Sequence, residues 1–410
     1  MRSVVSLFSG AGGLDIGLER AGYDIRLCVE NDPSALDTLR HNRRTWPVAN
    51  PGDIEELEPS ELLRQADLVQ GELTLLAGGP PCQPYSKAAY WVNGKAPGLS
   101  DPRAASLTRY LAMLESTLPE VFILENVLGL ASSNDREPLA LLNNQIGRVN
   151  ESYGTQYDPV MVKLNAADFG VPQRRERIFI IGARKGIQMS LPAATHAPPD
   201  DESRSTGPLM RWTTAWDAIG HLDSADWNPE LQPTGKWARL LPSIPEGRNY
   251  LYHTPEGGGL PLFGWRTRYW SFLLKLAKNL PSWTIQASPG PATGPFHWRN
   301  RRLSISELSR LQTFPDSYEV QGDYRAAHRQ IGNAVPPAIG ELIGQAIRHQ
   351  VLGEPHFKDP RLSLIPHQRA DCPSPEIPEQ VDESFKELVA DHSPHPGVGL
   401  GPRASRSTVE

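Results

Sequence analysis

Short apolar runs alternate with amphipathic stretches over the first 185 residues of the chain. The runs have the length and continuous apolar character of buried strands, and they are Val4–Phe8, Leu27–Val29, Leu73–Ala77, Val121–Leu124, Val160–Leu164 and Ile178–Ile181. Between them, helical periodicity predicts helices over Leu14–Ala21, Pro33–Arg40 and Ala104–Leu118. Strands that alternate with helices in this way are typical of a mostly parallel sheet covered by helices. The pattern therefore predicts an α/β fold.

The regular pattern breaks down after residue 190. Residues 191–300 are rich in Pro, Gly and Trp without a sustained period, which predicts a smaller, loop-rich second domain. In residues 301–350 helices are expected again, over Leu303–Leu311 and Pro336–His349, and we expect this part to return to the domain formed by residues 1–190. Residues 351–410 are rich in Pro, Ser and acidic residues, which predicts a mostly disordered tail.

Charge and cysteine content narrow the class of protein. The net charge of −6 argues weakly against a nucleic-acid partner, but residues 171–310 hold 18 basic and 11 acidic residues, which suits either a polyanion-binding surface or a solvated basic face. The three cysteines cannot build a disulfide framework or a four-ligand zinc site. Because no apolar run is long enough to span a membrane and the start is not leader-like, we expect an intracellular enzyme or binding protein.

The first candidate site begins at Phe8, in FSGAGG, where a strand ends and a helix begins. Its glycines allow a tight turn and a close approach of a ligand to free backbone N–H groups. G-x-G-G lacks the spacing of a full dinucleotide fingerprint, so a plain turn is an equal alternative. Glu30 ends the next strand, where an acidic side chain in such sheets can bind a ribose. Asp53 and Ile54 suit either an adenine ring or a helix cap.

Cys82 lies in GGPPCQPYS, directly after a predicted strand. Two glycines and two prolines constrain the backbone there in a way that no hydrophobic core requires, and open α/β sheets bind their ligands at the carboxyl ends of strands. A lone cysteine is usually inert and buried, and Cys28 inside a strand fits that description. Cys82 does not fit it, and it is the candidate nucleophile.

Two further groups are expected at the same edge of the sheet. Glu125 directly follows a buried strand, where desolvation raises a carboxyl pKa and suits it to donate a proton; an exposed strand-end carboxylate is the alternative. In QRRER, the side chains of Gln173, Arg175 and Arg177 share one face of an extended segment. Guanidinium groups there suit a phosphate or a base carbonyl, and surface salt bridges with Glu176 are the alternative.

In combination these motifs resemble those of the DNA (cytosine-5) methyltransferases, in particular the bacterial modification-type enzymes. They follow the order of that family over about residues 4–350, as LFSGAGG (7–13), Glu30, Asp53, PCQ (81–83), ENV (125–127), QRRER (173–177), RLS through RLQTFPD (302–316) and QIGNAVPP (330–337). The resemblance implies a Rossmann-like domain that depends on S-adenosyl-L-methionine, and it assigns residues 191–300 to a target recognition domain.

The resemblance also implies the reaction, which is methyl transfer from S-adenosyl-L-methionine to C5 of cytosine in a specific short sequence of double-stranded DNA. Cys82 would add to C6 of a flipped-out cytosine and form a covalent intermediate, while Glu125 stabilises or protonates N3. Arg177, with Arg175, would hold the base carbonyl or flanking phosphates and favour the thiolate of Cys82. The chemistry requires no metal.

By the same resemblance, individual residues are assigned to the two ligands. The expected cofactor contacts are Phe8, Gly10, Ala11, Gly12, Gly13, Glu30, Asp53, Ile54, Pro80, Asn333 and Val335, and the expected DNA contacts are Gln83, Ser86, Arg266 and Arg268. Residues 86–100 are expected to close on the flipped base. Two positions depart from the family pattern: Asn31 replaces an aromatic that many relatives carry, and Leu107 stands one residue later than the common spacing.

The sequence leaves competing functions open. They are an RNA cytosine-5 methyltransferase, a non-catalytic DNA-binding relative and, from the strand–glycine–helix start alone, a nicotinamide-dependent oxidoreductase, in which PCQ and ENV would have no function. The methyltransferase would serve either a restriction-modification system, with a cognate restriction endonuclease acting on the same site, or solitary DNA modification. A DNA substrate implies a cytoplasmic, nucleoid-associated location in a bacterium.

Overall fold

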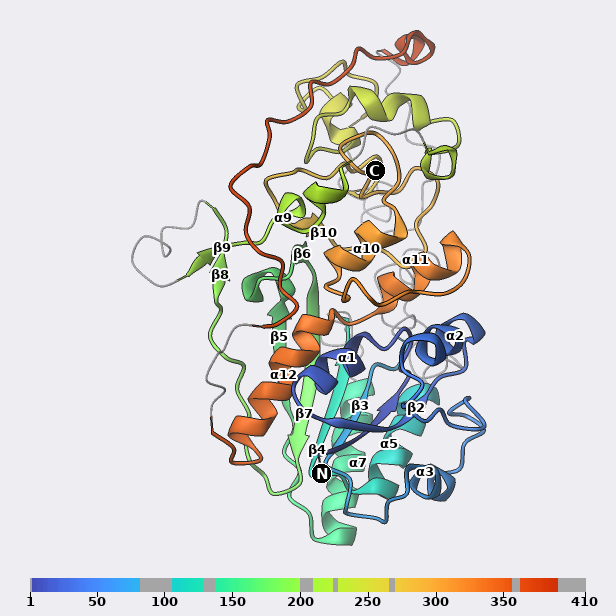
Figure 1. Ribbon diagram of the computed structural model, residues 1–410, viewed down its shortest axis with the longest axis vertical. Coiled ribbons are helices and arrows are strands. Elements are labelled where there is room, and N and C mark those ends of the chain that lie inside the picture. The colour runs from blue at the N-terminus through green and yellow to red at the C-terminus, as the bar shows by residue number, and fades with distance from the viewer. Residues whose placement is uncertain are drawn as a thin grey trace, which may run out of the picture.

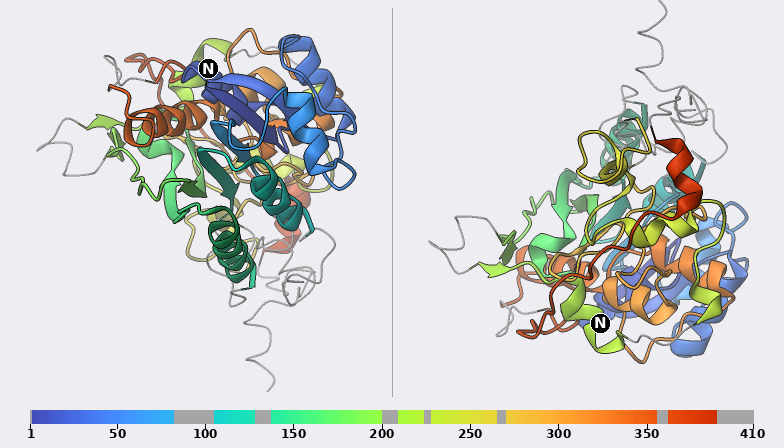
Figure 2. Two further views of the ribbon diagram at one scale, coloured as in Figure 1. Left: turned by 90° about the horizontal axis from the view of Figure 1, so that it is seen from below. Right: turned by 90° about the horizontal axis from the view of Figure 1, so that it is seen from above.

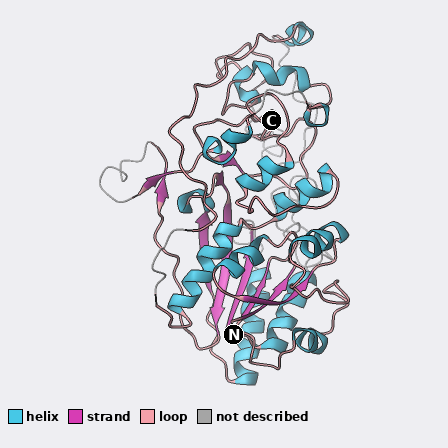
Figure 3. Cartoon of the chain, in the orientation of Figure 1, coloured by secondary structure: helices cyan, strands magenta, loops and turns pink. Residues whose placement is uncertain are grey.

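The computed structural model of the chain describes residues 2–81, 105–127, 137–199, 209–223, 228–264, 270–355 and 362–389 (Figure 1). Two lobes lie one above the other in this view. The lower lobe carries the large sheet, whereas the upper lobe consists mostly of loops and short helices (Figure 3). The predicted α/β fold is confirmed, with one six-stranded sheet at its centre.

The sheet has the strand order β2-β1-β3-β4-β7-β5. Its strands are β1 Ser3–Leu7, β2 Asp24–Val29, β3 Leu75–Gly78, β4 Val121–Asn126, β7 Glu176–Ala183 and β5 Val160–Asn165. Strands β1 to β4 pair in parallel, and β7 runs antiparallel to both β4 and β5. The carboxyl ends of the four parallel strands therefore meet at one edge, which faces the upper lobe in Figure 1.

Apolar residues on both faces of the sheet explain the continuous apolar runs, because helices cover each face. One core joins strand residues such as Val4 and Leu75 to helices α1 Gly13–Arg20 and α12 Pro337–Gln350. The opposite core joins Val5 and Leu76 to α3 Pro59–Ala66, α5 Ala105–Thr117 and α7 Glu137–Tyr153. Figure 2, left, shows orange α12 on one side of the sheet and the green and teal α7 and α5 on the other.

Helices α1 and α12 pack with their backbones in close approach. A Cβ atom at Gly17 would lie 2.2 Å from the carbonyl oxygen of Pro337 and 2.5 Å from the backbone nitrogen of Glu341. A Cβ atom at Gly13 would lie 2.3 Å from the carbonyl oxygen of Val335. Because these glycines lack a side chain, the start of α12 can pack against the backbone of α1, next to the first strand–helix turn.

The upper lobe has two small cores of its own. The first joins α9 Ala215–Ile219 and the buried Trp298 to α10 Ile305–Leu311 and α11 Tyr324–Asn333.

The remaining described elements are α2 Pro33–Asn42, strands β6 Gln173–Arg174, β8 His196–Ala197, β9 Met210–Arg211 and β10 Ser282–Trp283, and 3-10 helices Ala166–Phe169, Gly220–Leu222, Pro229–Leu231, Ala238–Ser243, Tyr250–His253 and Glu383–Leu388.

From the sequence we expected residues 301–350 as a whole to return to the domain formed by residues 1–190, and the packing differs from that expectation. Helices α10 and α11 share buried apolar contacts with the upper lobe, through residues such as Leu308 and Ile331. Within this stretch, α12 instead packs on α1 and the sheet. The apolar periodicity predicted these helices correctly, but it carries no information on which core they join.

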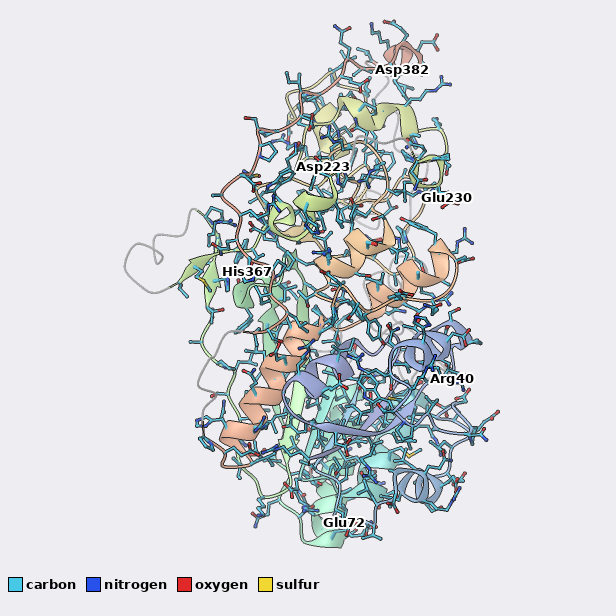
Figure 4. All side chains as sticks on the ribbon, viewed as in Figure 1. Arg40, Glu72, Asp223, Glu230, His367 and Asp382 are labelled. Atoms are coloured by element: carbon cyan, nitrogen blue, oxygen red, sulfur yellow. The ribbon has the colours of Figure 1, made fainter. Side chains whose placement is uncertain are left out.

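The described part of the tail also differs from the expectation of disorder. Residues 362–389 begin against α12 and its core and then run along the upper lobe as an extended segment that ends in a 3-10 helix, drawn in red in Figure 1. Figure 4 labels Asp382 at the far end of this lobe. Phe385 is buried in the second small core of the upper lobe, which it shares with residues such as Tyr250 and Phe263. Its ring stacks on that of Trp237 at 5.7 Å. Residues 356–361 and 390–410 lie outside the described part.

The tail is also held by polar contacts. Lys278 is buried, and its Nζ atom lies 2.6 Å from Glu246 and 3.0 Å from Glu376 of the tail. The backbone nitrogen of Arg369 donates to Asp217 at 2.6 Å. Single docked side chains thus order a segment that has neither helical nor strand periodicity, which is why the composition pointed to disorder.

Candidate active site

A cavity of about 460 Å³ opens at the carboxyl edge of the sheet. Its wall combines the turn after β1, Glu30 after β2, Gly79 to Pro81 after β3 and Glu125 near the end of β4. The end of α11 adds its last residue, Asn333, and the short segment between α11 and α12 adds Val335. Phe8 and Val335, which lie 327 residues apart in sequence, therefore line one cavity.

The glycine-rich turn is tied to Glu30. The backbone nitrogen of Gly10 donates to one carboxyl oxygen of Glu30 at 2.7 Å, and the other oxygen accepts from the nitrogens of Asn31 at 2.9 Å and Asp32 at 2.7 Å. Burial raises the pKa of Glu30, and these hydrogen bonds lower it in part. Both Gly10 and Gly12 have positive φ values, of 55° and 74°, which glycine adopts without strain.

The turn leaves room for a ligand against its backbone. Gly10 lines the cavity, and a Cβ atom at this position would have no neighbour within 4 Å, so the backbone here is open to the cavity. Phe8, at the end of β1, lines the same cavity. A planar ring and a diol can therefore be accommodated between Phe8 and Glu30, as a nucleoside-bearing cofactor requires.

Asp53 makes a cap-like hydrogen bond and also lines the cavity. One carboxyl oxygen accepts from the backbone nitrogen of Glu55 at 3.0 Å, as a cap does, and the other accepts from Asn31 Nδ2 at 3.2 Å. Asp53 and Ile54 both line the cavity. Asn31, which departs from the family pattern, thus orients Asp53 at the rim of the cavity.

Glu125 lies between a guanidinium group and a glycine. Its Oε1 atom is 3.1 Å from Arg177 Nε, and a Cβ atom at Gly79 would lie only 2.9 Å from Oε2. Burial raises the pKa of Glu125, and the charges of Arg177 and Arg175 lower it in part. The side chain is 12% exposed, so the carboxyl group is held at the cavity wall in a nearly dry setting.

Asn126 holds the turn that follows β3. Its Nδ2 atom donates to the carbonyl oxygen of Pro80 at 3.3 Å, and its Oδ1 atom accepts from the nitrogen of Val127 at 2.9 Å. Pro80 and Pro81 both line the cavity. The predicted site residues Cys82, Gln83, Ser86, Arg266 and Arg268, and the expected closing loop 86–100, lie outside the described residues.

The alternating face of QRRER points inward as the pattern predicts. Arg175 is 1% exposed, and its Nη2 atom donates to the carbonyl oxygen of Gly332 at 2.9 Å. Gln173 is also buried and donates to Gln312 Oε1 at 2.8 Å. Arg177, with Glu125, stands at the cavity. Arg175 also lines the cavity, and together with Gln173 it fastens this segment to the α10–α11 part of the chain.

Several contributors to the cavity were not singled out from the sequence. Gly79 lines the wall and Asn126 holds Pro80 in it; both belong to the motifs GGPPCQPYS and ENV, which gave the available signal, but neither was assigned a role. Ser106 lines the cavity, whereas Leu107, the residue with the shifted spacing, is buried in the core. Asp15 is fully buried at the inner wall, where burial raises its pKa to about 7.

Most arginines near residue 300 have structural partners. Arg301 forms a buried, bidentate pair with Glu307, at 2.8 and 2.7 Å. Arg299 pairs with Asp223, which is labelled on the upper lobe in Figure 4, at 2.9 Å for each of two bonds. These two arginines therefore hold the lobe together rather than face a ligand.

Two features are absent from the described residues. No three His, Cys, Asp or Glu side chains come together there as ligands for a metal ion. No helix in the same part of the chain has the length and apolar character that a membrane span needs.

Comparison with known proteins identifies the family. The family model of C-5 cytosine-specific DNA methylases matches residues 2–349. The chain is 37% identical to the Type II methyltransferase M.SacI of Streptomyces achromogenes over 390 residues, which cover 89% of this chain and 96% of that protein. It is 33% identical to the Type II methyltransferase M.NgoFVII of Neisseria gonorrhoeae, over 82% and 83% of the two chains.

Solved structures agree at the level of the fold. A crystal structure of a DNMT2 variant from Spodoptera frugiperda superposes with a TM-score of 0.55 at 16% identity, over 86% of this chain and all of the other. The match spans both lobes. The chain therefore belongs to the C-5 cytosine-specific DNA methylase family, and it is a DNA cytosine-5 methyltransferase.

Proposed function

We propose that the enzyme methylates C5 through a covalent bond between Cys82 and C6 of a flipped-out cytosine. The observation that carries this proposal is the carboxyl group of Glu125, held at the cavity wall between Gly79 and Arg177. Pro81, the residue before Cys82 in the sequence, lines the same cavity, and one peptide bond separates neighbouring Cα atoms by at most about 3.8 Å. A thiol and a proton donor can therefore reach one base.

The chemistry requires both groups because C5 of cytosine is a weak nucleophile. Addition of the Cys82 thiolate to C6 breaks the C5–C6 double bond, and a proton from Glu125 to N3 takes up the charge, so that electron density collects at C5. C5 would then take the methyl group while the bond from that methyl carbon to the donor's sulfonium sulfur breaks, and the sulfur would keep the electron pair as a neutral thioether. Loss of the C5 proton to a base, which a water or hydroxide can supply, re-forms the double bond and expels Cys82.

Arg177 and Arg175 have different parts in this proposal. Arg177 contacts Glu125 directly and, with one face at the cavity, can also hold the base carbonyl or a flanking phosphate. Its positive charge favours the thiolate form of a cysteine nearby. Arg175 acts as a positioning residue, because its hydrogen bond to Gly332 keeps β7 and the end of α11 together.

S-Adenosyl-L-methionine, the donor that the family implies, supplies an electrophilic methyl group when bound. The residues of the cavity fit this ligand: Glu30 would bind the ribose hydroxyls, Asp53 and Ile54 the adenine, and Phe8 one face of the ring. The proposed contacts also include Gly10, Ala11, Gly12, Gly13, Pro80, Asn333 and Val335.

The finer biological role is proposed from the relatives. Two relatives are named as Type II methyltransferases, which supports a role in a restriction-modification system with a cognate endonuclease. Within this proposal Gln83 and Ser86 contact the DNA around the flipped base, Arg266 and Arg268 contribute to recognition of the sequence, and no metal takes part. We also propose that the enzyme is located in the bacterial cytoplasm, at the nucleoid.

A methylation assay tests the mechanism. Wild-type protein, Cys82→Ala and the exposed control Cys372→Ala are incubated with radiolabelled S-adenosyl-L-methionine and mixed-sequence duplex DNA, and 5-methylcytosine is mapped by bisulfite sequencing. We expect label at one short recurring sequence with wild type and Cys372→Ala. Cys82→Ala should bind the cofactor but transfer no methyl group.

Two outcomes contradict the proposal. Methylation by Cys82→Ala at the wild-type rate would exclude the covalent mechanism. Label on RNA but not on DNA would overturn the proposed duplex substrate.

A further inference from the structure

A second cavity, of about 540 Å³, lies in the upper lobe between residues 287–296 and helices α10 and α11. Two arginines line it, Arg302 and Arg325, together with the hydroxyl groups of Thr234, Ser288 and Thr293. None of the described lining residues is acidic. The charge and the hydrogen-bond donors of this cavity therefore suit an anion.

The two arginines differ from their neighbours in their partners. Arg310 pairs with Asp316 and Arg329 with Asp32, as Arg299 and Arg301 pair with carboxylates. Within the part of the chain that the structure describes, Arg302 donates through its guanidinium group to a hydroxyl, Thr234 Oγ1 at 3.2 Å, and Arg325 is exposed without an ion pair. Because no described carboxylate pairs with Arg302 or Arg325, their positive charges can bind an anionic ligand.

The rest of the wall is neutral. Burial lowers the pKa of His328 to about 4, with a smaller contribution from the charge of Arg302, so this imidazole is uncharged near neutral pH and can still form hydrogen bonds. Phe296, Leu303 and several prolines supply an apolar surface. Apolar walls with two guanidinium groups fit a sugar and its phosphate better than a small inorganic ion.

Helix α11 connects this cavity to the active site. Arg325 and His328 line the second cavity, whereas Arg329, Gly332 and Asn333 line the catalytic one. A Cβ atom at Gly332 would lie 2.5 Å from the Cα atom of Ala287, so the two cavities meet where these backbones touch. From 325 to 332 the helix rises by about 10 Å, which corresponds to about three nucleotide steps measured along the axis of a DNA duplex.

We propose that this second cavity binds backbone phosphates of the DNA duplex within about three nucleotides of the target cytosine, through Arg302 and Arg325. The guanidinium group can bind two phosphate oxygens at once, which fixes the strand relative to the catalytic cavity. The inference rests on the proposed duplex substrate. It adds a phosphate subsite on α11, distinct from the residues that recognise the sequence.

Salt-dependent DNA binding by the full chain tests this subsite. The affinity for a fluorescent, non-cognate duplex is measured by anisotropy at several salt concentrations for wild type, Arg325→Ala and Arg302→Gln. Arg148→Ala is the matched control, because Arg148 is an exposed arginine on α7 in the other lobe. Binding of S-adenosyl-L-methionine is measured for each variant to verify the fold.

Each subsite variant should bind the duplex on the order of fivefold to tenfold more weakly near 0.1 M salt, since each phosphate contact contributes about 0.9 to the slope of log K against log salt. The slope should shrink by about that amount, whereas Arg148→Ala and cofactor binding should not change. An affinity and slope for Arg325→Ala equal to those of Arg148→Ala would refute the subsite, and so would a weaker affinity with an unchanged slope.

The outcomes for wild type keep the two proposals distinguishable. If wild type methylates duplex DNA but the arginine variants behave like the control, the subsite alone is wrong. If wild type neither binds nor methylates duplex DNA, the proposed substrate fails, and the subsite fails with it.

Discussion

Glu125 owes its expected role to its surroundings rather than to its residue type. Burial raises its pKa, and the two guanidinium groups of Arg177 and Arg175 reduce that shift without cancelling it. The carboxyl group is therefore more often protonated near neutral pH than a free glutamate is. A proton donor to N3 needs this property.

The pH dependence of Glu125→Gln tests this role. The fraction of protonated Glu125 falls as the pH rises through its raised pKa, whereas the fraction of Cys82 thiolate rises, so the wild-type rate should pass through a maximum. In Glu125→Gln we expect single-turnover methylation to be slower by roughly 10²–10⁴-fold, and the alkaline decline to disappear because an amide does not titrate.

The matched control is Glu151→Gln, which changes an exposed glutamate on α7. This variant should keep the wild-type rate and pH profile. An alkaline decline that persists unchanged in Glu125→Gln would show that another group is the proton donor.

At the scale of elements, the packing of α1 on α12 places part of the cofactor cavity. Val335 lies two residues before α12 and lines the cavity, and the close approach at Gly13 and Gly17 sets its position. The atoms nearest to the glycines belong to backbone, so they cannot move aside as the end of a flexible side chain does. A small increase in side-chain volume there must separate the helices.

We therefore expect Gly17→Ala to lower the free energy of unfolding by about 1–3 kcal/mol, as overpacked cores do, and to weaken cofactor binding. Gly147 on α7 is the control, because a Cβ atom there would have no neighbour within 4 Å. Gly147→Ala should raise the free energy of unfolding by about 0.5–1 kcal/mol. Denaturant midpoints measure both, and equal midpoints for the two variants would contradict the packing argument.

At the scale of the whole molecule, the tail joins the upper lobe after the chain has completed both lobes. Its Phe385 completes an aromatic core with Trp237, and its Glu376 lies beside the buried Lys278. The upper lobe has little regular secondary structure, so such contacts replace part of the stabilisation that longer helices or strands would supply. The tail should thus stabilise the upper lobe.

Phe385→Ala tests this contribution. Removal of a buried ring costs about 3–5 kcal/mol in a well-packed core, and we expect a lower melting temperature and faster proteolytic removal of the tail. Ile377 is the control, since it lies on the same tail and is 91% exposed. Ile377→Ala should change stability by less than about 0.5 kcal/mol, and an equal effect of both substitutions would show that the tail does not stabilise the lobe.

The sequence alone determined the local elements, the family and the identity of the expected chemical groups. Continuous apolar runs predict strands that are buried on both faces, and the residues that follow such strands must meet at one edge of a parallel sheet. This reasoning located Glu30 and Glu125 correctly at the cavity, and it brought Asn333 and Val335 there through the family motifs.

Only the tertiary structure decided which partner each group has. Sequence treats Arg299, Arg301 and Arg302 alike, yet the first two pair with carboxylates and the third lines a cavity. It also does not reveal that α10 and α11 join the upper lobe or that part of the tail is ordered. Periodicity records whether a residue is buried, whereas ion pairs, close backbone contacts and docked side chains depend on distant segments that the fold brings together.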